Sequence, residues 1–84
     1  MKYRSKYYKI RFENEISVVM NNSLEIFILD GISTEILLLL CTPKDFDQIV
    51  NTIYLKYNVN KNILYNDIKL LISSFIKKDL LEVY

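Results

Sequence analysis

The sequence contains no histidine, and this absence removes several kinds of chemistry at once. A Ser–His or Cys–His pair cannot activate a nucleophile within this chain. A metal site would have to be built from carboxylates alone, and no segment clusters them as a calcium-binding loop does. Glycine occurs once, so the chain has no glycine-rich loop to hold phosphates. We therefore expect a protein that is not an enzyme and that carries neither a metal nor another cofactor.

Cysteine is almost absent as well. Cys41 is the one copy, so no disulfide can form within the chain and nothing argues for secretion. It follows the apolar run 37–40, and we expect a small buried hydrophobic residue, not a redox thiol. That run is far too short to cross a bilayer, and the basic residues 1–12 lack the apolar core of a signal peptide. The expected location is cytoplasmic, without a membrane partner.

No charge of one sign dominates. The 84 residues include 11 Lys and Arg and 10 Asp and Glu, which gives a net charge of +1. This balance creates no general field that would attract nucleic acid or anionic lipid. Hydrophobic residues make up 51% of the chain, which is ordinary for a folded protein and wrong for a disordered one. The length predicts a single domain, residues 1–84.

Three short segments near the start are typical of β-strands. Residues 7–12 alternate with a period of two, which predicts a strand with Tyr8 on a half-buried face. Residues 16–20 are β-branched, and residues 24–29, LEIFIL, are almost wholly apolar. Short polar turns separate the three segments. The pattern predicts a three-stranded antiparallel meander.

The second part of the chain has helical signals. Asp30 and Gly31 end the third strand, and Ser33 or Thr34 is expected to cap a short, largely buried helix, in which residues 36–40 should all be core. Asp45 with Gln48 forms a capping-box pattern that opens an amphipathic helix ending near residue 57. A last helix is expected from about 63 to 78, after which residues 80–83 return to the core. The fold class is therefore α+β, a three-stranded antiparallel β-sheet followed by three α-helices.

The order of these motifs resembles the PqqD-like family, the precursor-peptide recognition elements of ribosomally made, post-translationally modified peptides. The family's third strand ends in Leu-Asn, a small residue or Thr, then Ile-Leu, and residues 29–37 here read LDGISTEIL. Its second helix opens with Thr-Val-x-Glu-Ile-Val and closes with Tyr, matched by DFDQIV at 45–50 and by Tyr57. Its third helix has Asp-Val-x-x-Phe-Leu-x-x-Leu, matched by DIKLLISSF at 67–75, and a Gly-Leu-Leu ending corresponds to DLL at 79–81.

The resemblance covers almost the whole chain, with three departures. Asp30 replaces the usual Asn, Asp79 replaces Gly and Asp45 replaces Thr. The first two substitutions keep turn or cap chemistry, and Asp caps a helix as well as Thr does. No single motif is specific, because each is mostly a pattern of core packing. The resemblance rests on their ordered combination.

The resemblance implies a winged-helix-like fold, no catalysis by the domain, and binding of a precursor's leader peptide. The leader would add as a strand to the edge of the third strand and lie in a groove beside the last helix. A separate enzyme, such as a radical SAM maturase or a lasso-peptide protease and cyclase, would then act on the precursor. The expected leader-binding residues are Leu24, Glu25, Ile26, Phe27, Ile28, Leu29, Leu64, Asp67, Ile68 and Leu71.

The residues themselves also allow plainer interpretations. A strand of Leu, Ile and Phe is more often simple core, although the family pattern turns Phe27 and Leu29 inward and leaves Ile26 and Ile28 less buried. An unguarded edge could instead pair with a second copy and form a homodimer. The apolar stripe of the last helix is more often core than ligand groove, and Asp67 could be a solvated carboxylate.

A winged-helix nucleic-acid-binding or transcriptional regulatory domain is the alternative function. A recognition helix should direct Arg, Lys, Asn or Gln toward the bases. The last helix offers Lys69, Lys77 and Lys78 on different faces, and arginine occurs only at Arg4 and Arg11. This distribution argues against a nucleic-acid partner.

Overall fold

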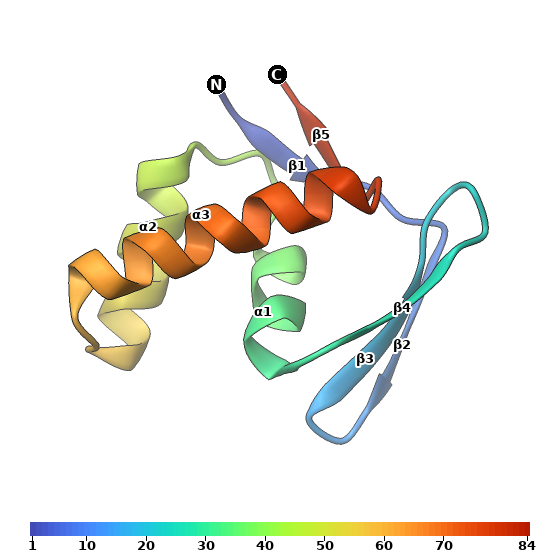
Figure 1. The fold of residues 1–84 in the computed structure, drawn as a ribbon, viewed down its shortest axis with the longest axis horizontal. Helices are drawn as coiled ribbons and strands as arrows, with labels where there is room; N and C mark the ends of the chain where they lie inside the picture. Colours follow the sequence, from blue (N-terminus) through green and yellow to red (C-terminus); the bar gives the residue numbers. More distant parts are fainter.

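Two antiparallel sheets and three helices build the molecule, and the computed structural model describes residues 1–84. Along the chain the elements are β1 (Tyr3–Ser5), β2 (Lys9–Glu13), β3 (Ile16–Met20), β4 (Ile26–Leu29), α1 (Gly31–Leu39), α2 (Phe46–Tyr57), α3 (Lys61–Lys77) and β5 (Leu81–Val83). The α+β class, the three-stranded antiparallel sheet and the three helices after it are confirmed. Figure 1 shows the main sheet at one end of the molecule and the chain termini close together.

The main sheet has the order β2-β3-β4, so β3 is central and β2 and β4 are the edges. Ser17 pairs with Leu29, and Val19 pairs with Phe27, which sets the register of β3 against β4. Because side chains alternate between the faces of a sheet, Val19 and Leu29 point to the same side, where both are buried. The meander expected from the sequence is therefore present.

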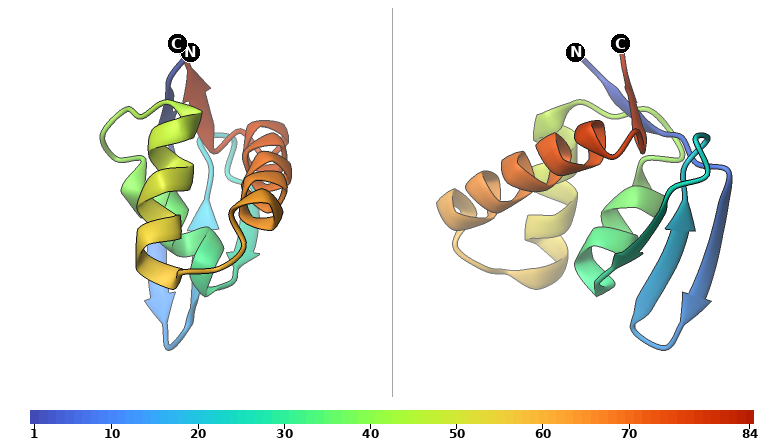
Figure 2. Two further views of the ribbon diagram at one scale, coloured as in Figure 1. Left: turned by 90° about the vertical axis from the view of Figure 1, so that its left-hand side faces the viewer. Right: turned by 45° about the vertical axis from the view of Figure 1, so that its right-hand side comes forward.

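All three helices lie on one side of the main sheet. In Figure 2, α1 lies between the sheet and the two longer helices, α3 lies on the β4 side and α2 on the β2 side. One cluster of 14 buried apolar residues joins these layers: Val19, Leu29, Ile36, Leu37, Leu40, Ile49, Val50, Ile53, Leu64, Ile68, Ile72, Phe75, Leu80 and Leu81. The opposite face of the main sheet has no covering layer.

The start of α1 differs from the expected one. Asp30 caps this helix, because its carboxylate accepts a hydrogen bond from the Ser33 backbone N–H at 2.8 Å. Ser33 and Thr34 lie inside the helix, where the Thr34 hydroxyl instead bonds the Ser17 hydroxyl at 2.6 Å. The expected cap was wrong because Asp30 comes directly after a strand and adopts the extended backbone that an N-cap needs. The capping box of α2, between Asp45 and Gln48, is confirmed.

Three burial expectations are wrong. Cys41 is exposed, because α1 ends at Leu39 and the chain turns outward before it reaches the cysteine. Leu38 is 40% exposed, so the run 36–40 is not uniformly core. Tyr8 is 66% exposed, because the first strand of the main sheet begins at Lys9 and leaves Tyr8 outside it.

The termini form a second sheet that the sequence did not reveal. β1 and β5 pair antiparallel, with Tyr3 opposite Val83 and Ser5 opposite Leu81. The Ser5 hydroxyl donates to the Leu37 carbonyl, which ties this small sheet to α1. Strands of three residues are too short for a period of two to be recognised. Leu80 and Leu81 return to the core as expected.

Candidate functional site

The outer edge of β4 has no partner strand. The Asn21 backbone N–H donates to the Glu25 carbonyl at 3.0 Å, which marks this pair as one that shares hydrogen bonds across the β3–β4 ladder. Hydrogen-bonded and non-hydrogen-bonded pairs alternate along antiparallel strands, so Phe27 and Leu29 direct their backbone groups toward β3. The N–H and C=O groups of Ile26 and Ile28 therefore point to the free edge.

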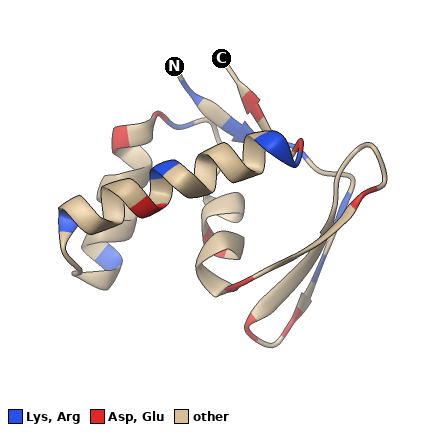
Figure 3. Cartoon of the chain, in the orientation of Figure 1, with Lys and Arg blue, Asp and Glu red and all other residues tan.

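The side chains of β4 divide between the two faces of the sheet. Phe27 is half-buried against the core and Leu29 is 3% exposed, so both point toward the helices. Ile26 and Ile28 are 61% and 70% exposed on the outer face. The inward and outward assignment made from the family pattern is confirmed. No residue of β4 is charged, as the tan segment in Figure 3 shows.

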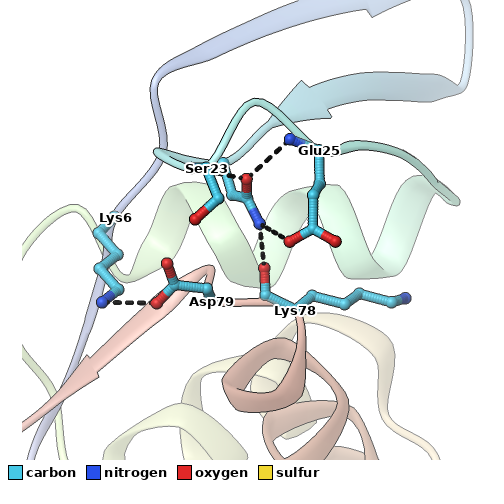
Figure 4. A network of polar contacts seen from close by, with 6 residues as sticks. Lys6, Ser23, Glu25, Lys78 and Asp79 are labelled. Carbon is cyan, nitrogen blue, oxygen red and sulfur yellow. Dashed lines mark hydrogen bonds and ion pairs between the residues drawn. The ribbon is translucent and has the colours of Figure 1, made fainter.

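Asn21 fixes the turn that leads into β4, and sequence reasoning missed this role. Its side chain is wholly buried and makes four hydrogen bonds, to Ser23, Glu25 and Lys78, the partners that are labelled in Figure 4. The amide oxygen accepts from the backbone N–H of Ser23 at 3.0 Å and of Glu25 at 2.9 Å. The amide nitrogen donates to the Glu25 carboxylate at 3.0 Å and to the Lys78 carbonyl at 2.8 Å.

The Asn21 bonds connect β4 to the end of α3. Lys78 follows that helix directly, and its Nζ lies 5.4 Å from the centre of the Phe27 ring, within the range of a cation–π contact. Asp79, the next residue, forms an ion pair with Lys6 at 2.7 Å. The sequence shows only that Asn21 follows a predicted strand. Asparagine is common in turns, so this position gave no sign of the buried hydrogen bonds.

The expected residues on α3 separate into two groups. Leu64 and Ile68 are 6% and 2% exposed and belong to the core, so they support the site from behind and are not open to a ligand. Leu71 is half-buried against the core, and Asp67 is exposed. The spacing of Asp67, Leu71 and Lys78 puts them along one flank of the helix. Because Lys78 lies over Phe27, this flank is the one nearest β4.

Leu24 and Glu25 precede β4 and are not part of it. Leu24 has a φ of 66° and is 65% exposed, so it belongs to the turn. Glu25 is exposed, and the Asn21 amide holds its carboxylate. Both residues lie at one end of the free edge. They could contact only the part of a peptide that extends beyond the segment paired with β4.

None of the hollows of the surface is lined by both β4 and α3, although Ile26 of β4 lines the smallest of them. A volume of about 640 Å³ opens between the β2–β3 turn, the start of α1 and Tyr57. About 470 Å³ lies between α2 and α3 beside Tyr3, and about 260 Å³ lies on the outer face of the main sheet. The expected groove between β4 and α3 is therefore not an enclosed cavity. A strand added to β4 would itself form one side of the groove.

Two carboxyl groups, those of Asp30 and Glu35, have lowered pKa values. Hydrogen bonds from Ser33 hold the pKa of the Asp30 carboxyl below its ordinary value. Hydrogen bonds from the Lys56 ammonium and the Tyr57 hydroxyl lower the pKa of Glu35. Both effects come from capping or ion pairing, which are structural uses. No group of His, Cys, Asp or Glu could hold a metal, and no helix combines the length and apolar character that crossing a membrane requires.

Comparison with known proteins bears on the fold. No family model and no curated protein matches the chain. Among solved structures, the chain is similar to TbiB1, which was solved in complex with the TbiA(beta) leader peptide. The two share 24% sequence identity and a TM-score of 0.78, over 94% of this chain and 96% of that one. The PqqD-like fold expected from the sequence is therefore confirmed.

Proposed function

We propose that this chain is a non-catalytic adaptor that binds the leader of a ribosomally made, post-translationally modified peptide by β-strand addition. The observation that carries the proposal is the open edge of β4, where the backbone groups of Ile26 and Ile28 have no partner. The fold shared with TbiB1, whose structure contains a leader peptide, supports the same assignment. Edge addition supplies affinity through main-chain hydrogen bonds and specificity through alternate side chains.

The edge of β4 suits an added strand in three respects. It contains no proline, so every residue keeps its backbone donor. It carries no charge to discourage pairing. The Asn21 hydrogen bonds hold its start against the end of α3, which keeps the edge in a fixed position before a ligand arrives.

A leader strand on this edge would lie between β4 and the near flank of α3. Its inward side chains would meet Phe27 and Leu71, which are half-buried and still have apolar surface to cover. Asp67 and Lys78 would flank that contact with one charge of each sign. This arrangement favours a leader with apolar inward residues and polar groups at either end.

The chemistry on the precursor belongs to another protein in this proposal. The chain has no histidine and no cluster of metal ligands, so a histidine-activated nucleophile and a metal centre, two common means of cutting a peptide, are missing from it. The partner enzyme would be a radical SAM maturase or a lasso-peptide protease and cyclase encoded nearby. The adaptor would raise the local concentration of the precursor at that enzyme.

The test is a titration with a fluorescein-labelled synthetic peptide that covers the leader of the precursor encoded beside this chain. The proposal expects saturable binding at micromolar concentration or below, competed by unlabelled leader and not by the core segment. A labelled DNA duplex serves as the comparison ligand. Binding to the duplex, with none to the leader, would reject the proposal in favour of the nucleic-acid alternative. If the chain self-associates and the leader does not reverse this, the edge of β4 instead pairs with a second copy in a homodimer.

A further inference from the structure

On the outer face of the main sheet, side chains form rows across the strands, and β4 is the last strand of each row. Two rows run across the strands, each from a cation on β2, through an aliphatic residue on β3, to an isoleucine on β4. The rows are Lys9–Met20–Ile26 and Arg11–Val18–Ile28. No helix covers this face (Figure 2).

Exposure along each row depends on the number of strand neighbours. Val18 and Met20, on the central strand, have a neighbour on both sides and are partly buried. Ile26 and Ile28 have a neighbour on one side only and remain 61% and 70% exposed. What each isoleucine lacks is the next side chain in its row, the position that a strand added to β4 would fill.

Core packing does not account for two isoleucines at these positions. Phe27 and Leu29 supply the contacts of β4 with the core, whereas side chains as exposed as Ile26 and Ile28 add little to it. An edge strand that has to stay unpaired is better protected by lysine than by isoleucine. The two residues therefore have the character of a surface that is covered in a complex.

We infer that the bound leader carries two aliphatic or β-branched side chains, two positions apart, on the outer face of its strand. They lie beside Ile26 and Ile28 and complete the two rows, while the leader residue between them points toward α3. The spacing follows from the alternation of side chains along a strand. This inference rests on the proposed function and adds the chemistry of the outward leader residues.

The variants Ile26→Thr and Ile28→Thr, singly and together, test the inference by isothermal titration of the full chain with the synthetic leader. Threonine keeps the β-branched shape that suits a strand and removes apolar contact. Each change should raise Kd about 2- to 5-fold, the range expected for one cross-strand pair, and the double variant should approach the product. Ile28→Val should keep the wild-type affinity. Leu55→Thr is the control. Leu55 is 81% exposed and belongs to α2, which lies on the β2 side of the sheet, away from the β4 edge (Figure 2).

The leader supplies the second half of the test. Threonine at its two outward positions should weaken binding to the wild-type chain and should weaken binding to the double variant much less, because the same contacts are already lost. Such a cycle separates direct contact from a folding defect. If the wild-type chain binds the leader and the double variant binds it equally well, the inference is wrong and the proposed function stands. If the wild-type chain does not bind the leader, both are wrong.

Discussion

The two edges of the main sheet are built differently. β2, with the sequence KIRFE, has three charged residues in five, and Arg11 pairs with Glu13 at 3.1 Å along its outer face. β4, with the sequence IFIL, has none. Figure 3 shows the contrast directly, since β2 carries blue and red segments and β4 is uniformly tan. Both are edge strands with one neighbour in the sheet, β3.

The difference indicates which edge is protected against pairing with another strand and which edge is available for it. Charged side chains on an edge discourage another strand from pairing there, and β2 has this protection. β4 lacks it, and its two outer residues, Ile26 and Ile28, are apolar and 61% and 70% exposed. An edge can remain open in this way if pairing is its function.

The turn into β4 should be the most sensitive point. Asn21→Ala removes four hydrogen bonds from a wholly buried side chain and leaves the Lys78 carbonyl without its partner. We expect a loss of about 2–4 kcal/mol in the free energy of unfolding, because unsatisfied buried polar groups each cost about 1–3 kcal/mol. Urea denaturation followed by circular dichroism measures it.

The turn that leaves β2 provides the matched control. Asn14 is exposed and has a φ of 55°, a conformation that glycine adopts readily. Asn14→Gly should change the unfolding free energy by no more than about 0.5 kcal/mol. Equal losses of unfolding free energy in the two variants would show that the buried hydrogen bonds of Asn21 add nothing to stability beyond what an ordinary turn residue adds.

Proline at Ile28 should affect binding more than folding. It removes an N–H that points to the free edge and leaves the bonds between β3 and β4 in place. Leader affinity should fall by about 1–3 kcal/mol, roughly 5- to 150-fold, because the leader loses a donor and keeps an unpaired carbonyl. The titration described above measures the change.

Phe12→Pro is the corresponding change on the protected edge. A two-residue turn joins Glu13 to Ile16, and such turns close on a hydrogen-bonded pair, so the next residue, Phe12, points its N–H outward. This variant should bind the leader with wild-type affinity. An equal loss from both prolines would mean that the substitution acts through the fold, and wild-type affinity in both would mean that the leader uses neither edge.

The end of β4 should show a smaller, pH-dependent effect. Asp30 caps α1 directly after the strand, and Asp30→Ala should reduce the unfolding free energy by about 1 kcal/mol at neutral pH. The pKa of this carboxyl is lowered in the folded protein, so its contribution is present above the ordinary value of about 4 and is lost as pH falls through the folded pKa.

Urea denaturation of wild type and variant at neutral pH and near pH 3 checks this sign. The difference between the two proteins should shrink in acid, since a protonated Asp30 accepts the Ser33 bond poorly. Asp30→Asn keeps a capping oxygen and should show little loss at neutral pH and no such pH dependence. A difference that persists unchanged near pH 3 would exclude the carboxylate as its source.

Much of the fold could be predicted because its signals are local. The period of two in β2, the capping box at Asp45 and the apolar stripe of α3 depend on neighbouring residues, and the structure contains each. What the sequence could not reveal depends on partners distant in the chain. Pairing of β1 with β5 joins the two ends, and Asn21 reaches Lys78 across 57 positions. The surroundings of Cys41 depended on where α1 ends, and helix ends are poorly fixed by propensity.

The candidate site was predicted in part, for the same reason. Alternation within LEIFIL divided its side chains into two sets, and the resemblance to the family then indicated that Phe27 and Leu29 point inward. Neither was enough to show that Leu24 belongs to a turn, or that Leu64 and Ile68 are closed off by the core. Those outcomes depend on how α3 packs, which an apolar stripe alone does not specify.

Amide hydrogen exchange at the two edges of the main sheet can show whether the leader adds as a strand to β4. In the free chain the N–H groups of Ile26 and Ile28 have no acceptor in the sheet and should exchange rapidly. Saturating leader should slow both by at least about 10-fold, as expected for amides that gain a hydrogen bond in a stable complex. Phe12, on the β2 edge, should keep its rate. Leader binding that leaves Ile26 and Ile28 exchanging as before would contradict strand addition to β4.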